Sequence, residues 1–231
     1  MATYSGLTHK QTAPLVHILG IVSIVLVIIW TYHYRGGYGL SGGPVFNVHP
    51  LLMIAGFIFL SSQAIISYKT VSGDRTYQKA VHMTLQGVAL LLGIVGILAA
   101  YKFHSDLKIQ NFYSLHSWFG IITILLYLLQ WILGFVSFWT QSLSSSTRAE
   151  LLPWHIFLGL GAFVTALATA ELGLLEKLTF LQKGAPFVGL WAREAMLVNS
   201  IGISVLLFGM VVVLTAVMPN PRRHEGYSPL E

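Results

Sequence analysis

The sequence predicts an all-α membrane protein with six transmembrane helices. Of its 231 residues, 55% are hydrophobic and only 9% are charged, and the mean hydropathy is +0.72. A soluble chain carries about 25% charged residues, so these few charges must share the protein surface with lipid. Six stretches approach the length of about 20 apolar residues that crosses a hydrocarbon core of about 30 Å. The chain is therefore expected to span a bilayer six times.

The six spans are separated by short connections that hold most of the charge. We expect the spans, within a few residues, at 14–34, 49–68, 82–101, 116–139, 153–174 and 195–218. No connection is long enough for a soluble domain, so residues 1–231 are expected to form one transmembrane domain with tails at about 1–13 and 219–231. Since backbone groups in lipid must be hydrogen-bonded within each segment, a six-helix bundle is the simplest arrangement.

The composition limits the chemistry that this chain can perform. The absence of cysteine excludes disulfides, iron–sulfur clusters, thiolate-ligated haem and c-type haem attachment. Nine histidines remain as the strong metal ligands. The net charge of +5 suits an anionic lipid or an anionic substrate, but polar residues are too sparse for a nucleic-acid-binding module.

Six spans place both termini on one side of the membrane. On the side of the termini lie seven basic residues: Lys10, Lys69, Arg75, Lys79, Arg148, Arg222 and Arg223. On the other side lie six: Arg35, Lys102, Lys108, Lys177, Lys183 and Arg193. Because cytoplasmic segments carry the excess of basic residues, this small difference favours cytoplasmic termini.

Four histidines each stand near the start of a different span. His49 precedes the second span, His82 opens the third, His116 opens the fourth and His155 opens the fifth. Because consecutive helices alternate in direction, His49 and His116 are expected near one membrane surface. By the same parity, His82 and His155 are expected near the other surface. Helix order alone thus predicts two histidine pairs stacked across the bilayer.

Paired neutral imidazoles favour a metal or a haem. Imidazole binds iron, zinc and copper, and two trans imidazoles leave haem iron without an open position, which suits electron transfer. The second, third and fourth spans contain no carboxylate, which zinc transport would favour. A histidine-lined metal-ion or proton transporter and a purely structural scaffold stay open as alternatives, because single histidines at helix ends often only bond nearby carbonyls.

A haem between two helices needs small residues beside its plane. Eight glycines are candidates for these positions: Gly56, Gly87, Gly93, Gly96, Gly120, Gly134, Gly159 and Gly161.

The segments around these histidines resemble the cytochrome b561 family, and in particular its plant ascorbate-dependent members. The resemblance is carried by residues 114–120 (SLHSWFG), 152–155 (LPWH), 46–50 (FNVHP), 34–37 (YRGG) and 175–181 (LEKLTFL). It extends over about residues 15–218. No single one of these motifs is specific, but their combination is.

This resemblance implies a fold, two cofactors and a reaction. Spans 2–5 would form the bundle that holds two b-type haems, with His49 and His116 as the non-cytoplasmic ligands and His82 and His155 as the cytoplasmic ligands. The reaction would be transmembrane electron transfer from cytosolic ascorbate to monodehydroascorbate or a ferric chelate, as in a transmembrane ascorbate-dependent oxidoreductase. Such proteins are commonly homodimers, and plant relatives favour a vacuolar or other endomembrane location.

The resemblance also gives roles to charged and polar residues at the two ends. Arg75, Lys79 and Arg148 would bind anionic ascorbate beside the cytoplasmic haem; similar proteins usually have Lys at the position of Arg75, so details of binding can differ. Lys69 would pair with a haem propionate. On the opposite side, the outer substrate site would contain Lys102, Phe103 and His104. The non-cytoplasmic haem would be contacted by Asn111, Phe112, Tyr113, Ser114 and Glu176.

Overall fold

The structure, a computed structural model, describes residues 8–140, 142–184 and 186–219, and in these residues it contains helices and no strand. The helical segments are α1 (His9–Ile29), η1 (Trp30–Tyr34), α2 (Gly42–Leu51), η2 (Leu52–Phe59), α3 (Leu60–Thr70), α4 (Arg75–Leu107), α5 (Leu115–Gly134), η3 (Phe135–Trp139), α6 (Ser145–Lys183) and α7 (Arg193–Val217). The three η segments are π-helical and continue their neighbours, so α2, η2 and α3 form one span. Six continuous helices are long and apolar enough to cross a membrane. The predicted six-span all-α fold is confirmed.

Several helices are longer than the sequence predicts. The helix α6 has 39 residues, or about 58 Å at 1.5 Å per residue, which exceeds the bilayer core. Segments expected as connections are therefore partly helical: α4 begins at Arg75 and runs to Leu107, and α6 contains Arg148 and Glu176. At the N-terminus, α1 begins at His9, inside the segment expected as a tail. Residues 1–7 and 220–231 of the expected tails lie outside the described residues.

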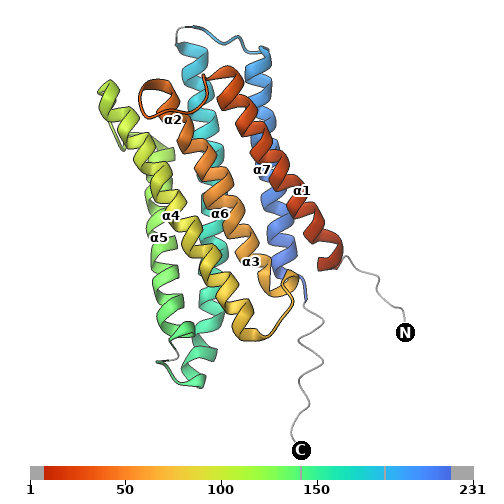
Figure 1. Cartoon of the computed structure of the whole chain (residues 1–231). Helices are drawn as coiled ribbons and strands as arrows, with labels where there is room; N and C mark the ends of the chain where they lie inside the picture. The colour runs from red at the N-terminus through yellow and green to blue at the C-terminus, as the bar shows by residue number, and fades with distance from the viewer. Residues whose placement is uncertain (1–7, 141, 185, 220–231) are drawn as a thin grey trace, which may run out of the picture.

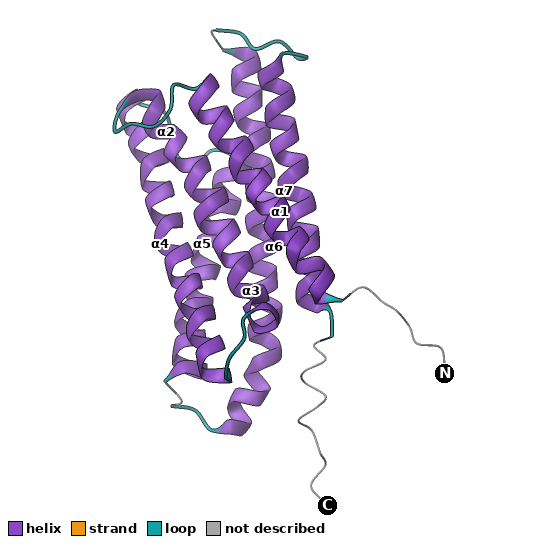
Figure 2. Ribbon diagram, turned by 45° about the vertical axis from the view of Figure 1, so that its right-hand side comes forward, coloured by secondary structure: helices purple, strands orange, loops and turns teal. Residues whose placement is uncertain are grey.

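The helices form an elongated bundle with α4 and α5 at one side and α1 and α7 at the other (Figure 1). The span α2–α3 and the helix α6 lie between them, and contacts join α1 to α7, α5 to α6, and α2 and α3 to α4. The helix α1 begins at the end of the bundle where α7 finishes. Figure 2 shows the connections gathered at the two ends, with uninterrupted helix between them. We call the end that holds the start of α1 the inner end and the opposite end the outer end.

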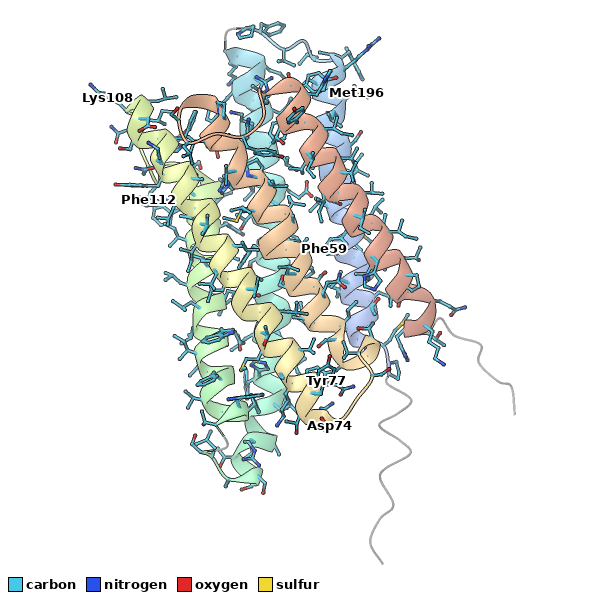
Figure 3. All side chains as sticks on the ribbon, viewed as in Figure 1. Phe59, Asp74, Tyr77, Lys108, Phe112 and Met196 are labelled. Atoms are coloured by element: carbon cyan, nitrogen blue, oxygen red, sulfur yellow. The ribbon has the colours of Figure 1, made fainter. Side chains whose placement is uncertain are left out.

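Side-chain caps fix where α4, α5 and α6 begin. Asp74 accepts a hydrogen bond from the backbone N–H of Tyr77 (2.7 Å) at the start of α4, and Ser114 and Ser144 cap α5 and α6 in the same way. Figure 3 shows Asp74 and Tyr77 at the inner end, and Lys108 and Phe112 at the outer end. The three capped helices carry His82, His116 and His155.

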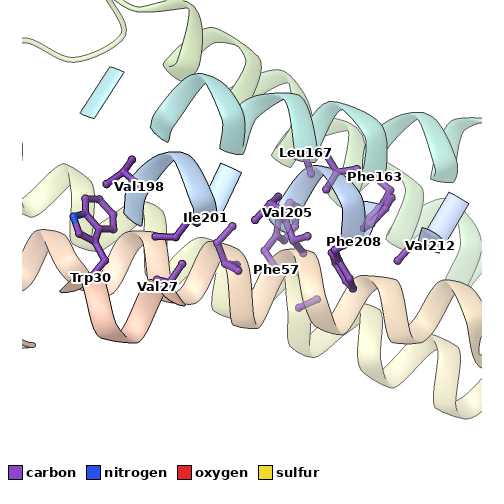
Figure 4. Close-up of a cluster of buried hydrophobic side chains, with 14 of the residues drawn as sticks. Val27, Trp30, Phe57, Phe163, Leu167, Val198, Ile201, Val205, Phe208 and Val212 are labelled. Atoms are coloured by element: carbon purple, nitrogen blue, oxygen red, sulfur yellow. The ribbon is translucent and has the colours of Figure 1, made fainter. Parts of the chain in front are cut away.

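The most closely packed core lies on the α1 and α7 side. Trp30, Phe163 and Phe208 are each at most 2% exposed there (Figure 4). A Cβ atom added at Gly20 would lie 2.5 Å from the ring of Phe59, so this glycine allows the helices to approach closely. Large apolar side chains are also exposed on the outer faces of α1, α4, α5 and α7, as contact with lipid requires.

Candidate functional site

At the outer end, the structure brings His49 of α2 and His116 of α5 together. Their ring centroids are 6.0 Å apart, with an angle of 85° between the ring planes. The Nδ1 atom of His49 donates to the carbonyl oxygen of Gly96 (3.0 Å), and Nδ1 of His116 donates to that of Thr169 (2.9 Å). Because a carbonyl can only accept, each imidazole carries its proton on Nδ1. The Nε2 atoms are left with free lone pairs for a metal.

At the inner end, His82 of α4 and His155 of α6 form a second pair, with ring centroids 6.3 Å apart. His82 Nδ1 donates to the carbonyl oxygen of Ala64 (2.8 Å). The ring of His155 is instead held by packing, because Phe138 lies 5.1 Å away and a Cβ atom added at Gly134 would be 2.9 Å from its Cε1 atom. The two histidine pairs therefore lie at opposite ends, as the parity of the helices predicts.

The spacing of each pair fits two axial ligands of one haem iron. With a metal–nitrogen distance of about 2 Å on each side, the centres of two trans imidazoles are about 6 Å apart. The carbonyl bonds to Nδ1 are the second-shell contacts that ligating histidines usually make. A Cβ atom added at Gly173 would lie 2.7 Å from Cε1 of His116, so the outer ring also needs a glycine beside it. Among the described residues, no group of three or more His, Asp and Glu side chains could hold a bare metal ion.

The comparison with known proteins decides the family. The model of the eukaryotic cytochrome b561 family matches residues 48–181, which include all four paired histidines. This chain belongs to that family. Membership in the cytochrome b561 family implies binding of b-type haem, in agreement with the paired imidazoles.

Plant relatives of known description are similar over most of the chain. Transmembrane ascorbate ferrireductase 2 of Arabidopsis thaliana is 45% identical over 207 residues, covering 88% of this chain and 90% of the relative. Two proteins of Oryza sativa subsp. japonica are described as probable ascorbate-specific transmembrane electron transporters 2 and 1. They are 44% and 48% identical, covering 100% and 88% of this chain and 99% and 88% of the respective relative.

The basic residues predicted to bind ascorbate all lie at the inner end of this cytochrome b561. The guanidinium of Arg75 lies 4.6 Å from the ring centroid of Tyr68, which is itself 5.4 Å from the ring of His82. Lys79 donates to the carbonyl oxygen of Phe138 (3.3 Å) and lines a cavity of about 280 Å³. Thr76, Phe138 and Trp139 complete that cavity. One aromatic residue thus lies between each of these cations and the inner histidine pair: Tyr68 for Arg75, and Phe138 for Lys79.

Arg148 and Lys69 hold backbone carbonyls. Arg148 donates to the carbonyl oxygen of Leu143 (2.8 Å), in the turn before α6. The ammonium of Lys69 donates to the carbonyl oxygens of Thr215, Ala216 and Met218 at 2.5 to 2.7 Å. These three bonds use all the protons of the ammonium group. Lys69 thus caps the C-terminal end of α7, and its contacts do not support the predicted pairing with a haem propionate.

At the outer end, the three residues predicted to bind the second substrate have different surroundings. Lys102 is exposed and forms an ion pair with Asp106 (2.9 Å). Phe103 packs against Phe46 with ring centroids 5.0 Å apart, and His104 Nδ1 bonds the side-chain oxygen of Asn111 (2.9 Å). Phe103 and His104 thus contact residues of other segments, whereas Lys102 contacts Asp106, one turn away on the surface of α4.

The segment predicted to contact the outer haem reaches α6 through one hydrogen bond. Ser114 Oγ donates to the carboxylate of Glu176 (3.2 Å), and the carbonyl oxygen of Phe112 accepts from the indole of Trp118 (2.9 Å). Burial, and secondarily the nearby Glu176 carboxylate, raises the pKa of the Tyr113 phenol. Tyr113 therefore stays protonated at neutral pH and can donate a hydrogen bond.

The structure adds residues that the sequence analysis did not single out. Gly173, Phe138 and Tyr68 contact the paired histidines. A second cavity of about 280 Å³ lies at the outer end and is lined by Tyr34, Arg35, Gly43, Phe46, Asn47, Phe103 and Lys177. Arg35 and Lys177 stand in two of the motifs that carry the family resemblance. Nothing in either motif indicates that the two cations share a cavity, because the 141 residues between them must fold before the two side chains meet.

Proposed function

We propose that this protein is a transmembrane ascorbate-dependent oxidoreductase. It takes one electron from cytosolic ascorbate and passes it to an acceptor on the other side of the membrane, either monodehydroascorbate or a ferric chelate. The observation that carries the proposal is the pair of histidine sites at opposite ends of a six-span member of the cytochrome b561 family. Relatives described as ascorbate ferrireductases and ascorbate-specific electron transporters support the choice of donor.

Each histidine pair holds one haem b in this proposal. Haem b supplies the one-electron redox chemistry of its iron, which no side chain of this chain can replace. His49 with His116, and His82 with His155, would hold the two groups through their Nε2 atoms. Gly96, Thr169 and Ala64 keep three of the rings in the required tautomer through their carbonyl oxygens.

Cations at the inner end bind the donor. Ascorbate is a monoanion at neutral pH, and Arg75, Lys79 and Arg148 attract it through charge and hydrogen bonds. Lys79, which lines the inner cavity, orients the ring of the donor and favours its deprotonated form. The proton released on oxidation leaves through water at this exposed end. At the outer end, Phe103 and His104 contribute to the acceptor site.

The membrane orientation and assembly form part of the same proposal. Cytoplasmic termini put the inner end, with its three substrate-binding cations, in contact with the cytosolic ascorbate pool. We also propose a vacuolar or other endomembrane location and a homodimer, as the family resemblance of the sequence implies.

The test is a spectrum of the purified protein before and after addition of ascorbate, with the haem counted per chain. We expect b-type bands in the reduced-minus-oxidised difference spectrum and two haems per chain. A colourless protein would exclude the proposal and favour a histidine-lined transporter or a scaffold, since neither of these needs haem.

A further inference from the structure

The cavity at the outer end, here called the Lys177 cavity, combines aromatic walls with cationic groups. It has a volume of about 280 Å³ and lies between η1, α2, α4 and α6. The rings of Phe46 and Phe103 form an apolar wall, with their centroids 5.0 Å apart. Small-molecule sites generally start at about 300 Å³, so this cavity has the size of a site for a compact six-carbon acid.

The two cations of this cavity have different partners. Arg35 is ion-paired with Glu194, whose carboxylate also accepts from the indole of Trp30 (2.9 Å). Lys177 instead lies with its Nζ 4.2 Å from the ring centroid of Phe46 and 5.9 Å from that of Phe103. Among the described residues, no carboxylate lies within ion-pair distance of Lys177. Lys177 thus gives the cavity its net positive charge.

The carboxylate next to Lys177 in sequence does not neutralise it. Glu176 accepts a hydrogen bond from Ser114 of the segment before α5. Lys177 points to α2 and α4 instead, because successive residues of a helix are turned by about 100°. The half-buried ammonium therefore faces the cavity without an ion-pair partner among the described residues, although Glu194, the partner of Arg35, also attracts it electrostatically.

One aromatic ring links the Lys177 cavity to the outer histidine pair. The ring centroid of Phe46 lies 6.0 Å from that of His49. The same ring carries the ammonium of Lys177 on its face. An anion held by Lys177 is therefore separated from the outer pair by a single side chain.

We propose that the Lys177 cavity binds the anionic electron acceptor and that Lys177 is its cationic anchor. The ligand is a small organic anion, either monodehydroascorbate or the carboxylates of a ferric chelate. This inference rests on the proposed function for the direction of electron flow. We assign the anchor to Lys177 and not to Lys102, because Lys102 is exposed, forms a surface ion pair with Asp106 and does not line the cavity.

The reaction at this cavity balances with the electron that ascorbate supplies at the inner end. Monodehydroascorbate takes up that electron and one proton and becomes the ascorbate monoanion. A ferric chelate takes up the electron alone, and its iron becomes ferrous. No further oxidant or reductant is needed.

The experiment uses the full-length protein, reduced with ascorbate and then freed of it. Its re-oxidation is followed by absorbance after mixing with ferric citrate, or with monodehydroascorbate generated by ascorbate oxidase. We expect Lys177→Gln to raise the half-saturating acceptor concentration about tenfold with little change in limiting rate, and Lys177→Arg to restore most of the loss. The matched control is Lys183→Gln, which removes an exposed cation of the same helix at the same end. This variant should change the half-saturating acceptor concentration less than about twofold.

Two further measurements separate charge recognition from damage to the fold. Hexaammineruthenium(III) is a cationic oxidant, so its half-saturating concentration should not rise in Lys177→Gln. Citrate, which is anionic and redox-inert, should raise the Tm of the wild type more than that of Lys177→Gln. An increase for only one of the two acceptors would assign the cavity to that acceptor.

The proposal is overturned if Lys177→Gln leaves both anionic acceptors unaffected, if it weakens the cationic oxidant equally, or if Lys102→Gln carries the effect instead. Failure of the proposed function itself would be seen earlier, as a wild-type protein without haem bands or without reduction by ascorbate. The citrate measurement would still test the cavity in that case.

Discussion

The two ends of the bundle hold similar histidine pairs within different distributions of charge. At the inner end, Arg75, Lys79 and Arg148 contact an aromatic ring or backbone carbonyls. Both ion pairs within the described residues lie at the outer end, where Glu194 and Asp106 neutralise two cations. The three inner cations thus have no ion-pair partner among the described residues. At the outer end, Lys177 is the cation without such a partner that lines the cavity beside the histidine pair.

The ends also differ in how the imidazoles are held. Both outer rings donate Nδ1–H to a carbonyl oxygen, whereas at the inner end, within the described residues, only His82 does so. His155 is positioned by Gly134 and Phe138 through contact alone. Hydrogen bonds therefore orient both outer rings and His82, whereas close packing orients the ring of His155.

The largest effect is expected from removal of one histidine of each pair. His82→Ala should abolish the inner site and His116→Ala the outer site, because a single imidazole cannot provide both axial ligands. Each variant should lose about one of two haems per chain, as measured by haem counting and by the difference spectrum. His17→Ala, on an exposed position of α1, is the control and should keep both haems. Loss of the same spectral component in both variants would refute the division into two ends.

A smaller effect is expected when a methyl group is added beside one ring. Gly173→Ala should displace the ring of His116, and Gly134→Ala that of His155, at a cost of about 1–3 kcal/mol for an overpacked site. Haem occupancy should fall at the outer end in the first variant and at the inner end in the second. Gly161→Ala on α6, where an added Cβ meets nothing within 4 Å, should retain both components. Equal spectra for all three variants would show that neither ring needs its glycine.

Neutralising the inner cations tests the difference in charge between the ends. Lys79→Ala and Arg148→Ala should each raise the half-saturating ascorbate concentration about tenfold, equivalent to about 1.4 kcal/mol, with both haems retained. Stopped-flow measurement of haem reduction by ascorbate gives this value. Lys10→Ala, an exposed cation at the same end, serves as the control. Unchanged reduction kinetics in both variants would remove these residues from the donor site.

The smallest effect is expected for Lys69→Met. Loss of three hydrogen bonds to the end of α7 should destabilise the protein by about 1–2 kcal/mol, seen as a lower Tm, with the inner spectral component unchanged. A shift of the inner haem spectrum without a change in Tm would instead support the propionate contact that the sequence suggests.

The sequence alone predicts the features that depend on the length of its apolar stretches and on the order of its helices. Apolar stretches of sufficient length predict six spans, and helix parity predicts that His49 meets His116 and that His82 meets His155. The lengths of the helices are less predictable, because polar ends such as residues 175–183 continue α6 beyond the membrane through packing and capping. The role of Lys69 is also hidden, since its three partners belong to α7, nearly 150 residues later.

By itself, the sequence determined the membrane class, the number of spans and the four histidines, because hydrophobic length and helix direction are local properties of the chain. Which glycines touch the rings, and which cations lack an ion-pair partner, becomes apparent only in the packed helices. Gly173 and Lys177 illustrate the reason: a ring contact or an ion pair depends on side chains from distant helices, and its geometry exists only once those helices pack together.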